Sequence, residues 1–175
     1  MPLKSILKAL ESKSNNCIKN LKKNRYVYIY KPIEGRVIPL KEVNDSAFKD
    51  GMLGKGCGII PEDDLLYSPV NGQVVSVFPT KHAITIVSEE GMEILIHLGI
   101  DTVKLKGEPF EVYVKGGDRV SINTKLAKMD NSIIRQKNFD NTVIVVITNP
   151  QDFQGVLLNQ GEHRYGREIL LRIER

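Results

Sequence analysis

Residues 82–103, HAITIVSEEGMEILIHLGIDTV, contain two short apolar runs that flank a polar turn. The runs, 82–88 and 92–98, are rich in β-branched and long aliphatic residues, and Glu89-Glu90-Gly91 separates them. Two strand-forming runs joined by a short turn that contains glycine are typical of a β-hairpin. His82 and His97 lie at the ends of the runs that are far from the turn. The stretch therefore predicts a hairpin with one histidine on each strand.

The register of this hairpin decides whether the two histidines meet. With a two-residue loop, Ser88 faces Gly91 and His82 directly faces His97; a four-residue loop keeps the same register. A loop of odd length would place the two histidines on opposite faces. Directly opposed residues have Cβ atoms about 4.5–5.5 Å apart. With an even loop, we expect the two imidazoles to be close enough to share one small ligand.

The rest of the chain after residue 25 continues in short strand-like runs. Turn residues separate eleven of them: 26–30, 35–39, 58–60, 64–67, 73–78, 82–88, 92–98, 110–114, 125–129, 142–148 and 168–173. Strands repeated about every ten residues favour a sandwich or barrel over βαβ units. Residues 130–138 read as a short helix that Asp130 caps. We expect an all-β fold, an antiparallel β-sandwich or distorted barrel with one or two short helical turns.

Residues 1–25 differ from the remainder in charge. They contain seven lysines and arginines and one glutamate, a net charge of +6, whereas the whole chain carries +4, so residues 26–175 carry about −2. Apolar residues at 3, 6, 7 and 10 have helical spacing. We expect a basic, partly helical N-terminal arm or linker at 1–25 and one β domain at 26–175. The arm is either a solvated tail or a segment that makes peripheral contact with an anionic membrane.

Composition excludes several classes of protein. The mildly acidic domain, without tryptophan or an aromatic platform, argues against a nucleic-acid partner. No apolar run approaches the roughly 20 residues of a transmembrane helix, and no secretory signal is recognisable. Cys17 and Cys57 lie in dissimilar contexts, which favours reduced thiols and a cytoplasmic location.

Two histidines on one face of a hairpin have three interpretations. They are either core residues satisfied by the backbone, a phosphoryl-accepting pair, or metal ligands. Phosphoryl acceptance needs a neutral imidazole with one free nitrogen, while the N–H of its other nitrogen is held by an acceptor. A second histidine, or a hydroxyl such as that of Thr80, would then donate to the phosphoryl oxygens. Gly99 leaves space beside His97 for an approaching partner.

Zinc is the chemical rival of a phosphoryl group at this pair. His82 and His97 could bind zinc, but a catalytic zinc site needs three protein ligands. Asp101 or His163 could complete such a set, although the spacing does not require it. We therefore expect that the site requires neither a metal nor a cofactor.

Four segments together resemble a known family. They are GKGCGIIP at 54–61, SPVNGQV at 68–74, TKHAI at 80–84 and HLGIDTV at 97–103. In this order they resemble the glucose-class enzyme IIA, the phosphocarrier domain of the bacterial phosphoenolpyruvate-dependent sugar phosphotransferase system. The resemblance extends over about residues 26–175. It implies an antiparallel β-sandwich with two facing histidines in a shallow depression.

The resemblance also implies roles at the histidines. His97 corresponds to the residue phosphorylated on Nε2, and His82 to the residue that stabilises the phosphoryl group. Thr80 corresponds to a hydroxyl that orients a ring.

A partner surface is implied around these residues. Asp45 and Asp101 resemble acidic residues that meet a basic patch on the small histidine-containing phosphocarrier protein, and Phe48, Phe78 and Val103 would surround the docking surface. Phosphate would arrive from that carrier and leave to a cysteine of an enzyme IIB domain in a sugar permease. The alternative is a regulatory binding module that holds permeases or kinases through the same face without passing phosphate to sugar.

Overall fold

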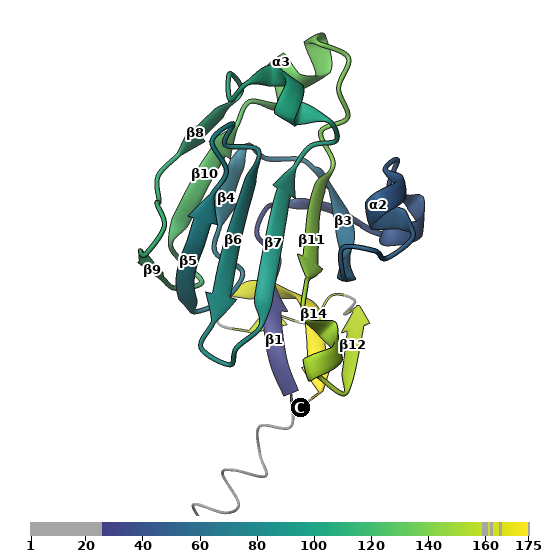
Figure 1. The fold of residues 1–175 in the computed structure, drawn as a ribbon, viewed down its shortest axis with the longest axis vertical. Helices are drawn as coiled ribbons and strands as arrows, with labels where there is room; N and C mark the ends of the chain where they lie inside the picture. Colours follow the sequence, from purple (N-terminus) through teal and green to yellow (C-terminus); the bar gives the residue numbers. More distant parts are fainter. Residues whose placement is uncertain (1–25, 159–160, 162, 165, 175) are drawn as a thin grey trace, which may run out of the picture.

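The computed structural model describes residues 26–158, 161, 163–164 and 166–174, which form mostly antiparallel strands (Figure 1). The largest sheet has seven strands in the order β2-β3-β11-β7-β6-β5-β9. Their bounds are β2 Gly35–Pro39, β3 Lys55–Pro61, β5 Gly72–Val77, β6 Ala83–Ser88, β7 Glu93–Leu98, β9 Arg119–Val120 and β11 Val143–Ile147.

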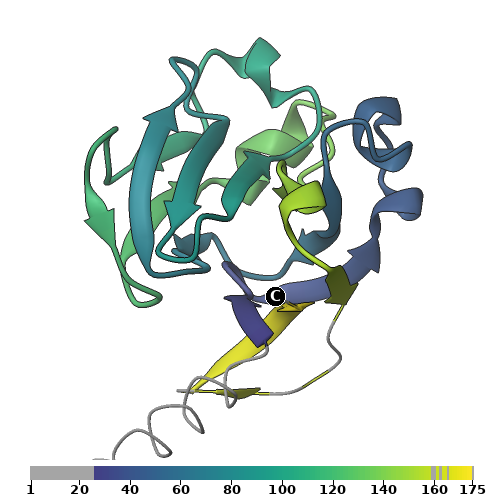
Figure 2. The same ribbon diagram turned by 60° about the horizontal axis from the view of Figure 1, so that its bottom comes forward.

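Two smaller sheets complete the sandwich. One has the order β4-β10-β8, with β4 Leu65–Tyr67, β8 Phe110–Val112 and β10 Lys125–Met129. The other has the order β1-β14-β12, and β13 pairs with β14. The bounds are β1 Tyr26–Tyr30, β12 Gly155–Leu158, β13 His163–Arg164 and β14 Arg167–Glu174. Figure 2 shows β1 and β14 side by side below the other two sheets.

The helical elements are short and lie between strands. They are η1 Leu40–Glu42, α2 Ser46–Lys49, η2 Thr102–Leu105, α3 Asn131–Gln136 and η3 Pro150–Asp152. The Asp130 side chain accepts from the backbone N–H groups of Ser132 and Ile133, so it caps α3 as the sequence predicts. No helix in the described part of the chain combines the length and the hydrophobicity that crossing a bilayer requires.

Strand β11 is buried on both faces. All five residues of its sequence VIVVI are buried. Val143, Val145 and Ile147 pack into the main core between the sheets. Ile144 and Val146 point to the opposite face and join a smaller apolar cluster beneath η1 and α2, together with Ile38, Val43, Phe48 and Ile100. The smaller cluster is the floor on which the histidine of the neighbouring strand β7 rests.

The hairpin predicted for residues 82–103 forms, but its predicted register is wrong. Ala83, and not His82, lies opposite His97, and Val87 lies opposite Glu93. The Ser88 N–H donates to the carbonyl of Met92. The loop therefore has three residues, 89–91, and Gly91 adopts a φ of +86° that glycine tolerates without strain.

The predicted fold class is confirmed. Each of the eleven predicted strands overlaps a strand of the structure, and the strands pair antiparallel. Strands β9, β12 and β13 were not predicted, because each is short and lies at the end of a sheet path or pairs off it. The division into an arm at 1–25 and a domain at 26–175 stays a prediction, since the arm lies outside the described residues.

Candidate functional site

His97 lies near the end of β7, on the face of the large sheet that carries the smaller apolar cluster. Its neighbours across the sheet are Ala83 on β6 and Ile144 on β11. Both neighbours are buried apolar residues. The imidazole is therefore supported on both sides by side chains that offer no hydrogen bond, so its polar contacts come from the loops at the end of the sheet.

The two predicted histidines meet despite the odd loop. Their ring centroids are 5.0 Å apart and the ring planes are inclined by 82°. His82 precedes the first residue of β6 and follows Lys81, which has a left-handed φ of 56°. Strand alternation does not apply to a residue in this bend, so the odd length of the loop does not put His82 on the opposite face from His97. The Leu98 N–H donates to the His82 carbonyl at 2.7 Å and fixes the bend against β7.

The hydrogen bond of His97 determines which of its nitrogens is free. Nδ1 lies 2.8 Å from the carbonyl oxygen of Gly99. A carbonyl only accepts, so Nδ1 must carry the hydrogen, and in the neutral ring Nε2 holds the lone pair. Gly99 has a φ of +79°, which brings its carbonyl within reach of the ring two residues earlier. This is the arrangement that a nucleophilic imidazole needs.

His82 is held by a different kind of partner. Its Nδ1 lies 2.6 Å from Oγ1 of Thr80. A hydroxyl can donate as well as accept, so the Thr80 hydroxyl can donate to Nδ1 and leave the hydrogen of His82 on Nε2. The structure thus places Thr80 against the His82 ring, whereas the resemblance implies only that its hydroxyl orients one of the two rings. The two rings differ in that one offers a lone pair and the other can offer an N–H.

Burial lowers the pKa of both imidazoles. For His82, removal from water lowers the pKa below its ordinary value of 6.5. For His97, burial is the largest cause of the lowered pKa, and the neighbouring charge of His82 acts in the same direction. The hydrogen bond to Gly99 and the carboxylates of Asp45 and Asp101 oppose this shift without reversing it. Both rings are therefore neutral at pH 7.

We expect this lowering to be visible in a pH titration. In an NMR titration, both imidazoles should protonate at a lower pH than a free histidine, whose pKa is about 6.5. The unfolded chain then binds more protons than the native chain below pH 6.5, so the free energy of unfolding should fall as the pH drops from 6.5 through the native pKa values. A midpoint at or above 6.5 for His97 would contradict a neutral nucleophile.

Aromatic rings pack against both imidazoles. Phe48 of α2 contacts His97 edge-to-face, with centroids 5.2 Å apart, and Phe78 contacts His82 at 5.5 Å. The Asp45 side chain caps α2 by accepting from the N–H groups of Ala47 and Phe48. Phe48 is only 4% exposed, so it supports the His97 ring from within the protein and does not surround the docking surface as the resemblance implies. Phe78 is 40% exposed and contributes to the outer surface.

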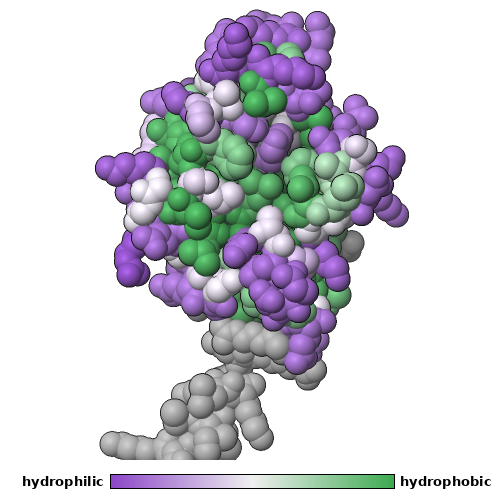
Figure 3. All heavy atoms as spheres, viewed as in Figure 1, coloured by the Kyte–Doolittle hydropathy of each residue, from purple (hydrophilic) through white to green (hydrophobic). Residues whose placement is uncertain are grey.

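The surface around the pair is apolar with charges at its margin. Figure 3 shows hydrophobic residues gathered over the face that carries β6, β7 and β11, with hydrophilic residues around them. Val103, in η2 shortly after β7, is 46% exposed. Asp101 forms an ion pair with Lys104, whose Nζ lies 2.7 Å from Oδ2 of the carboxylate. The sequence argument missed this pair, although acidic and basic residues three apart in a helical turn are its usual signal.

The described residues offer little support for a zinc site. Among them, no group of three or more histidine, cysteine, aspartate or glutamate side chains is placed to hold a metal ion. Cys57 is buried in the main core, and burial raises the pKa of its thiol to about 12. Two imidazoles alone fall short of the three protein ligands of a catalytic zinc site.

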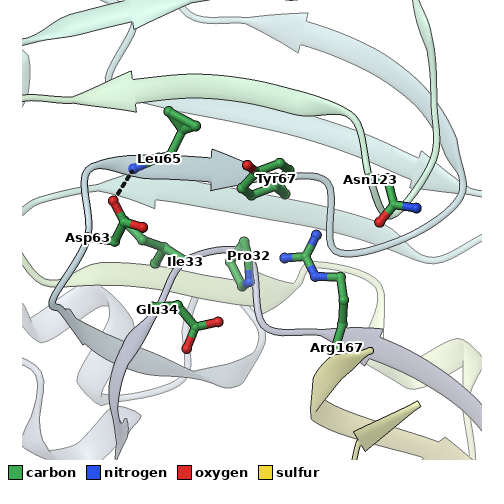
Figure 4. Close-up of a pocket in the computed structure, with 8 residues that line it drawn as sticks. All are labelled: Pro32, Ile33, Glu34, Asp63, Leu65, Tyr67, Asn123 and Arg167. Atoms are coloured by element: carbon green, nitrogen blue, oxygen red, sulfur yellow. Dashed lines mark hydrogen bonds between the residues drawn. The ribbon is translucent and has the colours of Figure 1, made fainter. Parts of the chain in front are cut away.

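A separate cavity of about 310 Å³ lies away from the histidines (Figure 4). Its lining includes Glu34, Tyr67 and Arg167. The Arg167 guanidinium donates to the carbonyls of Ile122 and Lys31 and lies over the Tyr67 ring. Arg167 thus joins three chain segments, and the cavity contains none of the predicted site residues.

Comparison with known proteins relates this chain to components of sugar phosphotransferase systems. The family model for the phosphoenolpyruvate-dependent sugar phosphotransferase system, EIIA 1, matches residues 27–153. The glucose permease IIA from Mycoplasma capricolum superposes with a TM-score of 0.72 at 32% identity, covering 85% of this chain and 96% of that one.

Relatives in sequence carry related names. The PTS system glucose-specific EIIA component of Oceanobacillus iheyensis is 41% identical over 130 residues, which are 74% of this chain and 79% of that protein. The PTS system beta-glucoside-specific EIIBCA component of Bacillus subtilis is 44% identical over 125 residues, 71% of this chain. The match spans 20% of the length of that larger relative.

Proposed function

Since this chain belongs to the EIIA 1 family of the phosphoenolpyruvate-dependent sugar phosphotransferase system, we propose that Nε2 of His97 carries its phosphoryl group. Family membership confirms the resemblance seen in the sequence and makes the chain a phosphocarrier domain and a phosphotransferase component. The observation that carries the residue assignment is the hydrogen bond from His97 Nδ1 to the Gly99 carbonyl, which leaves the lone pair on Nε2.

The proposed transfer exchanges one nitrogen–phosphorus bond for another. The Nε2 lone pair of His97 attacks the phosphorus, and the bond from phosphorus to the donor atom breaks with its electron pair returning to the donor. The phosphorylated ring keeps its hydrogen on Nδ1, where the Gly99 carbonyl holds it. Once the phosphoryl group is on His97, the Nε2–H of His82 donates to its oxygens, on which charge is spread again when the group leaves for the acceptor. A centroid distance of 5.0 Å leaves the two rings close enough to act on one phosphoryl group.

We further propose the partners on each side of this step. The donor is the small histidine-containing phosphocarrier protein, and the acceptor is a cysteine of an enzyme IIB domain. Apolar Phe78 and Val103, with the carboxylates of Asp45 and Asp101 nearby, suit transient docking of a partner that presents apolar and cationic groups. A relative whose name joins the letters B, C and A in one component is consistent with a IIB acceptor. A cytoplasmic location is part of the same proposal.

Reconstituted phosphotransfer tests this function. The chain is incubated with the carrier, enzyme I and radiolabelled phosphoenolpyruvate. We expect one acid-labile, base-stable phosphoryl group per chain, which adding a IIB domain should remove. Absence of label under conditions that phosphorylate the carrier itself would refute the proposal.

Removing Lys104, the ion-pair partner of Asp101, should strengthen binding of the phosphocarrier protein. Lys104 occupies the carboxylate that a cationic partner would use, and both side chains are more than half exposed. An exposed pair of this kind is worth about 0.2–1 kcal/mol. We expect Lys104→Gln to lower the dissociation constant for the carrier by about two- to fivefold at low salt, and less at high salt.

The matched control for this charge removal is Lys106→Gln. Lys106 is also exposed, lies two residues away and changes the net charge equally. Each substitution is placed in a chain whose His97 is replaced, so that no phosphoryl group is accepted. Isothermal titration calorimetry with the carrier then gives the dissociation constant of each variant. Equal effects of the two variants would assign the change to net charge and not to the ion pair.

A further inference from the structure

The peptide groups of Leu98 and Gly99 connect the two histidines. The Leu98 N–H donates to the carbonyl of His82 at 2.7 Å. The carbonyl of the following residue, Gly99, accepts a hydrogen bond from Nδ1 of His97 at 2.8 Å. The orientation of both rings therefore depends on how these two successive residues are held.

Thr102 holds them from the side away from solvent. It is completely buried, at 0% exposed. Its Oγ1 donates to the Leu98 carbonyl at 2.5 Å and lies 3.5 Å from the Gly99 carbonyl. A hydroxyl has one hydrogen to donate, and the shorter contact takes it. The Leu98 carbonyl oxygen would be left without this donor if the hydroxyl were removed.

The methyl group of Thr102 restrains the same turn. A Cβ added at Gly99 would lie 2.5 Å from Thr102 Cγ2 and 2.9 Å from the carbonyl oxygen of Asp140. Space beside Gly99 is therefore closed by one side chain and one backbone group, and the expectation from the sequence that Gly99 leaves room there for a partner is wrong. The Gly99 N–H donates to the Thr142 carbonyl at 3.1 Å, which anchors the turn on its other side.

We propose that Thr102 is a positioning residue for phosphoryl transfer, acting through the Leu98–Gly99 turn. Its hydroxyl fixes the Leu98 carbonyl, and its methyl group closes the space beside Gly99, so that the Gly99 carbonyl faces His97 Nδ1. That contact keeps the hydrogen of His97 on Nδ1 and the lone pair on Nε2. Thr102 does not touch the reacting atoms. The inference rests on the proposed function in taking His97 as the acceptor.

Substitutions at Thr102 separate the hydroxyl from the methyl group. Thr102→Val keeps the shape and removes the hydroxyl, and Thr102→Ser keeps the hydroxyl and removes the methyl group. Ser68→Ala is the matched control, because Ser68 is also 0% exposed and its Oγ donates to the Val70 carbonyl at 2.7 Å, away from the site. The readouts are the ¹⁵N chemical shifts of the His97 ring, which report the tautomer, and the rate of phosphorylation by the carrier.

We expect Thr102→Val to shift the His97 ring toward a mixture of tautomers and to lower kcat about 10- to 100-fold with little change in KM, as small misplacements of reacting groups do. Thr102→Ser should recover most of the rate, and Ser68→Ala should leave tautomer and rate unchanged. A Thr102→Val ring with the wild-type tautomer and rate would overturn the proposal.

Two further comparisons keep the outcome decisive. If Thr102→Val does not fold, the pair Thr102→Ser and Thr102→Ala takes its place, because these two variants differ only in the hydroxyl. Equal tautomers and equal rates in that pair would overturn the proposal. If the wild-type chain accepts no phosphoryl group, the proposed function fails, while the ring shifts still test the positioning of His97 by themselves.

Discussion

Replacing His97 by glutamine is expected to abolish phosphoryl acceptance, with a loss of at least about 10³-fold. The substitution removes the nitrogen whose lone pair faces away from the Gly99 carbonyl. Glutamine is close to histidine in size and can still donate to that carbonyl, so the turn at Gly99 should keep its conformation. The measurement is the initial rate of label transfer from the phosphorylated carrier.

A second histidine substitution controls for chemistry elsewhere in the chain. His163→Gln removes the third histidine of the sequence and should leave the initial rate unchanged. Circular dichroism and thermal melts of both variants establish that they are folded. Stoichiometric acid-labile label on the folded His97→Gln chain would move the acceptor to another residue.

His82→Ala is expected to affect the two halves of the relay unequally. The nucleophile remains, so acceptance from the carrier should survive. Onward transfer to the IIB cysteine should fall about 10²- to 10³-fold, the usual effect of removing one donor that stabilises transition-state charge. The inequality follows because acceptance begins with the phosphoryl group held in the donor's own site, whereas departure relies on the groups around His97.

Glutamine at position 82 separates hydrogen bonding from ring packing. His82→Gln offers an amide N–H near the position of the imidazole N–H and should recover part of the onward rate. Single-turnover chase of the phosphorylated chain with a IIB domain isolates this step. Unimpaired onward transfer by His82→Ala would remove the role assigned to the second ring.

Much of the fold was predictable because its strands have local signals. Runs such as VIVVI at 143–147 and the hairpin of residues 82–103 are apolar, β-branched and bounded by turns. The hairpin register was not predictable, because loops of two, three and four residues all fit the sequence around Gly91. The wrong register did not affect the prediction that the two histidines meet, because His82 lies in a bend where strand alternation no longer applies.

The contacts that complete the candidate site were beyond sequence reasoning for a different reason. Phe48 and His97 are 49 positions apart, and only the packing of α2 against the large sheet brings their rings to 5.2 Å. The hydroxyl of Thr102 looks like one more buried threonine until the Leu98 carbonyl is placed beside it. Long-range packing and single hydrogen bonds of this kind leave no periodic pattern in a sequence.

Strand β11 has a consequence for how the domain can serve successive partners. Its alternate residues belong to the main core and to the floor beneath His97, so the site cannot loosen without opening the centre of the large sheet. Openings of that kind cost nearly the full free energy of unfolding and are correspondingly rare. The domain therefore carries the phosphoryl group on a rigid surface. Donor and acceptor would have to take turns on one unchanging surface, and the time between them would be set by dissociation of the first partner and not by a motion of the domain.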